Sequence, residues 1–236
     1  MEIGFESEIS DEARRILEDW DREAAALDTF INALAGATLD LRVQLAPILA
    51  TDQHAVSEQG WLAAQSEFLC FLLHLVSRIS LAELGFAKRD LLHEKLAAPS
   101  VEFLLSKTVP YADVVEIERL RRNIMDSIRE AELRYGKCSK TINLTALQQS
   151  YLDMTLDEQQ ASADNHEYWA EIGLISPTVM SAMDPTYLFG QLGTRIMTSV
   201  GKPQDAKGFV DLTLACHEIS RKLDLSRLVQ DLGSTL

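Results

Sequence analysis

Glu67, His74 and Arg78 form the most suggestive group of chemically reactive side chains in this sequence. They are seven and four residues apart, which is close to whole turns of an α-helix, so the three side chains share one narrow line along it. Histidine can gain or lose a proton near neutral pH, and a neighbouring acid or base tunes that exchange. If this line faces a cleft, its residues could bind a small molecule or carry a proton.

A simpler interpretation of the same line is structural. Most other side chains of the segment are apolar, among them Trp61, Phe68 and Leu72. The charged side chains of a helix that is buried on most sides have to reach solvent, and this line would then be the narrow face exposed to water. We favour this interpretation and keep Glu67, His74 and Arg78 as possible ligand-binding residues. The sequence assigns no catalytic, cofactor-binding or metal-binding residue.

One pair of residues has the spacing of a known helical metal site. His93 follows Asp90 by three residues, the separation at which two side chains on one helix can reach the same ion. A second such motif and further carboxylate-bearing helices are missing, so a surface Asp–His pair is the favoured interpretation. A metal-binding bundle that uses His93 or His74 remains an alternative.

The three cysteines give no clear sign of nucleophilic or redox chemistry. Cys216 and His217 are adjacent, which on a helix points their side chains about 100° apart. Cys138 lies between Lys137 and Lys140, where a thiol pKa could be lowered, but we favour a plain exposed cysteine. An odd number of cysteines without a C-x-x-C pair argues against a disulfide framework and indicates a reducing compartment.

Two features could in principle bind phosphate. Gly190 and Gly193 lie inside an apolar helical pattern that follows no strand, so close packing of a second helix is favoured over a nucleotide site. Residues 119–140 carry seven bases, but these are spread around the helix without the aromatic side chains that stack on bases. We expect this basic segment to contact an acidic end of the chain, within or between subunits.

Charge and hydropathy exclude several classes of protein. The 236 residues are 47% hydrophobic with a net charge of −14, and both ends are acidic, which argues against DNA binding. The longest apolar run, residues 68–76, is too short to span a membrane. Residues 1–8 are acidic and lack the features of a signal peptide. We therefore expect a cytoplasmic protein without membrane or DNA partners.

Hydrophobic periodicity and capping residues predict helices almost throughout. The expected helices cover about 10–36, 38–50, 58–84, 86–97, 100–107, 110–135, 144–174 (one bent helix or two), 177–183, 185–200 and 203–223, with a short tail at 224–232. Their start signals include Ser10, Ser57, Pro110, Thr145, Thr155, Ser176, Asp184 and Pro203. Gly36, Gly85 and Gly136 are expected to end helices, and Pro47 and Pro99 to interrupt them.

The predicted fold is an all-α, irregular bundle of about eight to ten helices. We expect an N-terminal bundle at 1–136 built around the apolar helix 58–84, and a C-terminal region at 144–236 packed on it as one unit or as a second subdomain. Our leading functional hypothesis is a non-enzymatic interaction or regulatory protein that self-associates. The alternatives are a small-molecule-binding protein or enzyme with a pocket around Glu67, His74 and Arg78, and the metal-binding bundle. No cofactor is expected.

Overall fold

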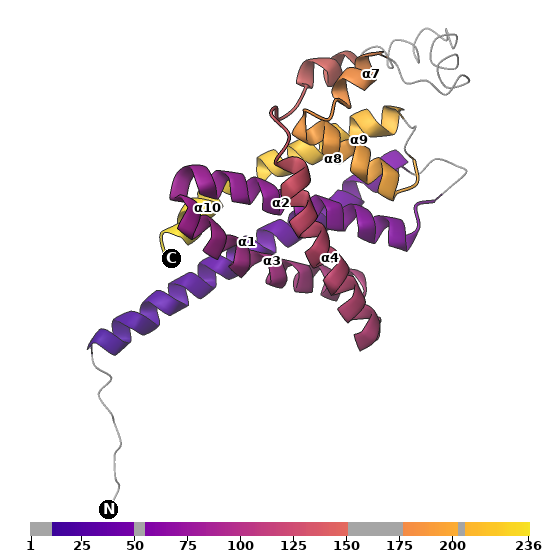
Figure 1. Cartoon of the computed structure of the whole chain (residues 1–236). Coiled ribbons are helices and arrows are strands. Elements are labelled where there is room, and N and C mark those ends of the chain that lie inside the picture. Colours follow the sequence, from indigo (N-terminus) through magenta and orange to yellow (C-terminus); the bar gives the residue numbers. More distant parts are fainter. Residues whose placement is uncertain (1–10, 50–54, 151–176, 203–205) are drawn as a thin grey trace, which may run out of the picture.

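A computed structural model shows an all-α protein, as predicted, and describes residues 11–49, 55–150, 177–202 and 206–236. This part of the chain contains eight delimited helices, a further helical stretch at 144–150 and no β-strand. The helix α2 (Glu58–Leu84) runs through the middle of the molecule (Figure 1). Packed around it are α1 (Asp11–Leu49), α3 (Phe86–Thr108), α4 (Val114–Tyr135), α8 (Leu188–Ser199) and α10 (Leu225–Gly233). None of the described helices is long and apolar enough to cross a membrane.

The first helix, α1 (Asp11–Leu49), is one continuous helix of 39 residues. The predicted end at Gly36 and the separate helix at 38–50 are therefore wrong. A glycine costs a helix only about 1 kcal/mol, which burial of the side chains around Gly36 offsets: Leu34 and Leu41 are both fully buried. Pro47 lies in the last turn, where its missing N–H removes a single helical hydrogen bond.

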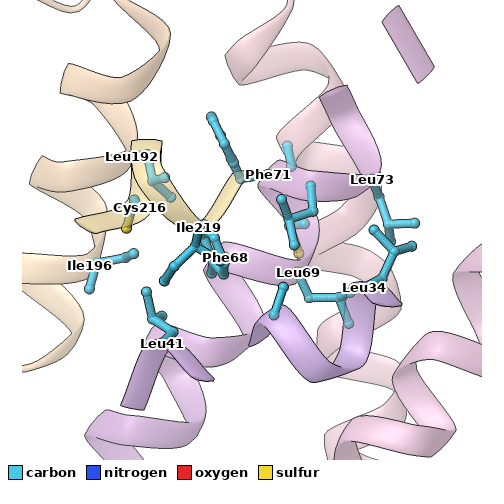
Figure 2. Packing of buried hydrophobic residues seen from close by; sticks show 14 of the residues in the cluster. Leu34, Leu41, Phe68, Leu69, Phe71, Leu73, Leu192, Ile196, Cys216 and Ile219 are labelled. Carbon is cyan, nitrogen blue, oxygen red and sulfur yellow. The ribbon is translucent and has the colours of Figure 1, made fainter. Parts of the chain in front are cut away.

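The central helix, α2 (Glu58–Leu84), has the boundaries that the sequence predicts. The Ser57 hydroxyl accepts a hydrogen bond from the Gly60 N–H at 3.0 Å, and Gly85 ends the helix with a φ of 81°, a backbone conformation that favours glycine. Figure 2 shows its side chains Phe68 and Leu69 packed among apolar residues of α1, α8 (Leu188–Ser199) and α9 (Ala206–Lys222).

In each of the next two helices one end agrees with the prediction and another feature does not: α3 starts at Phe86 and α4 ends at Tyr135, as expected. α3 (Phe86–Thr108) continues through Pro99 instead of stopping there, because Leu96 and Val101 on either side are both fully buried in the core. α4 (Val114–Tyr135) begins after Asp113, whose carboxylate accepts the Glu116 N–H at 2.8 Å. Pro110 precedes the helix. A side chain that accepts a backbone N–H therefore sets this start, and the proline does not.

The connection at 137–143 is tied to the N-terminal end of α8. The Lys140 N–H donates to the Thr186 carbonyl at 3.0 Å, and the Leu188 N–H donates back to the Lys140 carbonyl at 2.9 Å. Asn143, and not Thr145, caps the helical stretch at 144–150 by accepting the Ala146 N–H at 3.2 Å. Helices before and after this connection share one hydrophobic core, and the proposed two-part division stays a prediction.

The C-terminal region contains α7 (Pro177–Ala182), α8, α9 and α10 (Leu225–Gly233). Pro177 stands first in α7, as predicted. The Asp184 carboxylate accepts the Thr186 N–H within a turn, so α8 begins at Leu188, three residues later than expected. The expected tail at 224–232 is a helix that packs on α1 and α2. The start signals at Ser10, Thr155, Ser176 and Pro203 lie outside the described residues.

Gly190 and Gly193 have the packing role that the sequence favours. A Cβ on Gly190 would lie 2.3 Å from the Ala182 carbonyl oxygen. A Cβ on Gly193 would lie 2.4 Å from the Thr213 hydroxyl and 2.7 Å from the Phe209 ring, both on α9. Helix α8 can approach its neighbours this closely only because both positions lack a side chain.

Gly193→Ala should lower the free energy of unfolding by about 1–3 kcal/mol, because the added methyl overpacks the contact between α8 and α9. Gly36→Ala is the matched control: its Cβ would meet nothing within 4 Å, and alanine favours a helix by about 1 kcal/mol. We expect this variant to be more stable than the wild type. Urea unfolding measures both, and a Gly193→Ala protein of wild-type stability would contradict the close approach.

Candidate functional site

The line of Glu67, His74 and Arg78 on α2 is divided between the interior and the surface. Glu67 and His74 are only 7% and 3% exposed, whereas Arg78 is exposed. The favoured interpretation, a solvent-facing line, is therefore wrong for the first two residues and right for the third. Both buried side chains contact residues of α4, so the line turns toward a neighbouring helix.

Glu67 is the centre of a buried charged network. Its Oε1 accepts hydrogen bonds from the Arg134 guanidinium at 2.5 Å and from the Tyr135 hydroxyl at 2.6 Å. Its Oε2 lies 3.4 Å from the guanidinium of Arg195 on α8. One carboxylate thus faces two guanidinium groups. The distance from Glu67 to Arg195 is longer than its distance to Arg134.

Tyr135 holds one side of this network in the core. Its side chain is fully buried, with its ring edge-on to Phe71 at a centroid distance of 5.4 Å. Burial and the adjacent Glu67 carboxylate raise the pKa of Tyr135 well above its ordinary value. The phenol therefore stays protonated and acts as a hydrogen-bond donor to Glu67. Cys70, one turn along α2, has a thiol pKa raised chiefly by burial, which makes it unreactive.

Glu67 lies on the wall of a cleft of about 490 Å³, which we call the cleft above Glu67. Its walls come from α2 and α4, with contributions from α1, α8 and the end of α3. The lining includes apolar side chains (Leu62, Leu120 and Ile124) and uncharged polar ones (Gln59, Asn123 and Ser199). The volume lies within the usual range for small-molecule sites, and the mixed lining is typical of them.

Three arginines line this cleft, each beside a glutamate. Arg42 binds Glu58 through two hydrogen bonds of 2.7 and 2.6 Å, and the pKa of Glu58 is lowered by that pairing. Arg119 binds Glu116 at 3.0 and 2.6 Å. Arg195, by contrast, is 45% exposed, and among the described residues its one ion pair is the 3.4 Å contact with Glu67. Of the three, Arg195 is the guanidinium that the described residues engage least.

His74 belongs to a second polar cluster, between α2, α3 and α4. Its Nδ1 lies 3.4 Å from Glu132 Oε2, but neither ring nitrogen makes a hydrogen bond to a described residue. Arg89 of α3 reaches the same carboxylate oxygen at 3.3 Å and donates to the Ser77 hydroxyl at 2.8 Å. His93 lies close enough for its charge to act on Glu132. The structure thus places Glu67 and His74 in separate networks.

Burial and charge act in opposite directions on the two titrating groups of this cluster. Burial raises the pKa of Glu132, but His74, His93 and Arg89 outweigh it, so the pKa lies below its ordinary value. Burial lowers the pKa of His93, despite the nearby Glu132 carboxylate. Both shifts favour a charged Glu132 beside a neutral His93 near neutral pH.

Cys138 lies in a setting that the sequence did not predict, whereas Cys216 and His217 stay apart as expected. Cys138 is buried with its Sγ 3.4 Å from the Pro185 carbonyl oxygen, so neither an exposed nor an activated thiol fits. Burial raises its pKa, and Arg78 opposes this only in part. Cys216 is buried in the core, while the His217 ring packs edge-on against Phe189. No nucleophile–base pair is formed by these residues.

The basic segment at 119–140 is paired chiefly with its own helix and with α3. Arg121 contacts Glu102 of α3 and Glu118, and Arg129 contacts Asp126. The expectation of a contact with an acidic end of the chain is not met by these described pairs. Spacing along α4 places acids three residues from Arg119, Arg121 and Arg129. Glu102 of α3 also pairs with Arg121, and Glu67 of α2 pairs with Arg134.

In the described parts of the chain, no three histidine, cysteine, aspartate or glutamate side chains converge so that they could hold a metal ion. The alternative that uses His93 or His74 gains no support there. Comparison of the chain with protein-family models, curated proteins and solved structures finds no match in any of the three. Function has to be argued from the site itself.

Sequence reasoning found one member of the cleft site and missed the others. Glu67 stood out because it is a charge in an apolar helix. The sequence singled out Arg134 only as one of the seven bases at 119–140, and not as a partner of Glu67. Arg195 is 128 residues from Glu67. The sequence around it gave no indication that it would contact α2. Glu132 was missed as the partner of His74 for the same reason.

Glu67→Gln should lower the free energy of unfolding by about 2–4 kcal/mol, because it leaves Arg134 and Tyr135 without the buried carboxylate. Glu58→Gln is the matched control, since it also removes a glutamate of the cleft, but one that is 76% exposed. We expect that variant to unfold almost as the wild type does. Urea unfolding compares the two, and equal effects would show that burial of Glu67 carries no special cost.

Lowering the pH should destabilise the protein in two stages. The unfolded chain takes up a proton from about pH 6.5, the ordinary pKa of His93, before the folded chain does. In the second stage the unfolded chain takes up a proton on Glu132 from about pH 4.5, the ordinary pKa of that residue, while folded Glu132 is still charged. The stability that charged Glu132 contributes is lost as the pH falls through its lower pKa in the folded protein. His93→Gln should flatten the first stage and Glu132→Gln reduce the second in urea unfolding across pH.

Glu130→Gln serves as the control for a general change in charge, because Glu130 lies near Glu132 on the same helix but is 74% exposed. A His93→Gln variant that keeps the full wild-type pH dependence between about pH 7 and about pH 5.5 would refute the first assignment.

Proposed function

We propose that this protein binds a small organic anion in the cleft above Glu67. The observation that carries the proposal is Arg195, a half-exposed guanidinium on the wall of a 490 Å³ cleft, with one long contact to a carboxylate that is already paired. A guanidinium offers five N–H donors in a planar fork that suits carboxylate, sulfonate and phosphate groups. Such a group on a ligand would complete the pairing of Arg195.

The rest of the cleft supports an organic ligand with an anionic group. Leu62, Leu120 and Ile124 provide apolar surface for a hydrocarbon or aromatic part. Arg42 and Arg119 are bound by the accessible carboxylates of Glu58 and Glu116, which are 76% and 42% exposed. A ligand anion could exchange with either carboxylate, because exposed pairs of this kind are worth little.

This proposal corresponds to the small-molecule alternative from the sequence, with a different set of residues. Glu67 is kept as the anchor of the site, while Arg195 and Arg42 take the places of His74 and Arg78. Glu67 acts here as a positioning residue, since its free oxygen draws Arg195 to the cleft wall. No catalytic step is part of the proposal.

Anilinonaphthalene sulfonate is a suitable probe, because it combines an aromatic body with one anionic group and fluoresces when it enters an apolar site. We expect saturable binding with a stoichiometry of one, monitored by fluorescence and confirmed by calorimetry. Arg195→Gln should weaken this binding at least tenfold, since a hydrogen bond to a charged group contributes about 1.5–3 kcal/mol.

Arg227→Gln is the matched control, because Arg227 on α10 is 77% exposed and does not line the cleft. It should bind the probe as the wild type does. Urea unfolding of Arg195→Gln checks that the protein is folded. A folded Arg195→Gln protein with unchanged affinity would overturn the proposal, as would a wild type that binds no probe up to about 1 mM, a concentration corresponding to about 4 kcal/mol of binding free energy.

A further inference from the structure

The N-terminal part of α1 extends past the other described helices (Figure 1). We call residues 12–22 the α1 arm. Every side chain described in it is exposed, and the first described ion pair between α1 and α3 is that of Glu23 with Lys95. Further along α1, Phe30 and Leu34 are fully buried. The helix thus passes from solvent into the core within about two turns.

The apolar seam of α1 continues unbroken into the arm. Leu17, Trp20, Ala24, Leu27 and Ile31 follow one another at intervals of three and four residues, and the last two pack on the core. Leu17 and Trp20 are 46% and 65% exposed. An isolated helix of this length is marginal in water, since its stability depends on packing an apolar face. The arm therefore presents a seam with no covering element among the described residues.

We propose that a second copy of this chain covers the seam, with the two α1 arms packed side by side in antiparallel orientation. Leu17 of each copy would then lie on Trp20 of the other, as in an antiparallel coiled coil. In this register the positions that flank the seam are Arg14 and Asp21, so Arg14 of one copy faces Asp21 of the other. The two-fold symmetry makes this pairing occur twice.

Charge decides between the two orientations of the arms. Neither Arg14 nor Asp21 is in an ion pair with another described residue, and both side chains are exposed. In the antiparallel pair they meet opposite charges. In a parallel pair the flanking positions of the arm would instead bring Ile16 of one copy beside Asp21 of the other, and Arg14 would not reach Asp21. The complementary arrangement is the antiparallel one.

The arm is short, which limits the area that a dimer can bury and therefore its affinity. Eleven helical residues span about 16 Å, and two such arms bury less area than the usual 1,200–2,000 Å² of a stable interface. We therefore expect a dimer that forms in the range of about 10–100 µM, which corresponds to about 5.5–7 kcal/mol. This inference is independent of the cleft and of its proposed ligand.

Analytical ultracentrifugation of the full chain from about 1 to about 500 µM, well below and above the expected midpoint, tests the proposal. The wild type should pass from monomer to dimer, and Trp20→Ser should remain a monomer throughout. Tyr111→Ser is the matched control, because Tyr111 is 98% exposed and lies in the connection between α3 and α4. This connection adjoins the cleft near Arg42 and not the arm, so the variant should dimerise as the wild type does.

A charge exchange tests the orientation. Arg14→Asp and Asp21→Arg should each weaken dimerisation at least tenfold, and the double variant should restore it to within about threefold of the wild type. A wild type that stays monomeric, a dimer that Trp20→Ser does not weaken, or a double variant no better than the single ones would each overturn the proposal. Circular dichroism and urea unfolding confirm that every variant is folded.

Discussion

An ionised carboxylate in a protein interior needs opposite charge and hydrogen-bond donors buried with it, and Glu67 imposes this condition on the fold. Helix α2 is surrounded by five other helices, so most of its polar side chains need internal partners. Arg134 and Tyr135 approach Glu67 from α4, and Arg195 approaches from α8. The rotation of α4 and the position of α8 along α2 follow from these contacts.

His74 imposes a related condition two turns further along α2. Its neighbour Glu132 lies on the same helix as Tyr135, three residues earlier, so one face of α4 meets both buried residues. Arg89 brings α3 to the same carboxylate. Hydrogen bonds such as those of Glu67 with Tyr135 and of Arg89 with Ser77 hold only over a narrow range of distance and angle. The polar networks therefore define how α2, α3 and α4 fit together.

The two proposals concern two places where contacts with the described residues are incomplete: a charge in the cleft and an apolar helix face. Arg195 reaches Glu67 only at 3.4 Å and leaves much of its guanidinium to the cleft. The α1 arm carries its seam past the edge of the core, where Trp20 has lost the neighbours that cover Phe30. A ligand anion would pair with the Arg195 guanidinium, and a second chain would cover the apolar seam of the α1 arm. Each can fail without affecting the other.

The sequence by itself determined the all-α class, both ends of α2, and Glu67 as an unusual charge, because capping and the 3.6-residue period are local properties. Only the tertiary structure decided that Glu67 and His74 face α4, that α1 continues through Gly36 and α3 through Pro99, and that Arg195 joins the site. The physical reason is common to all of these. A helical period shows which residues share a face, but which helix covers that face, and how much its packing can offset a weak helix former, depends on segments far away in the chain.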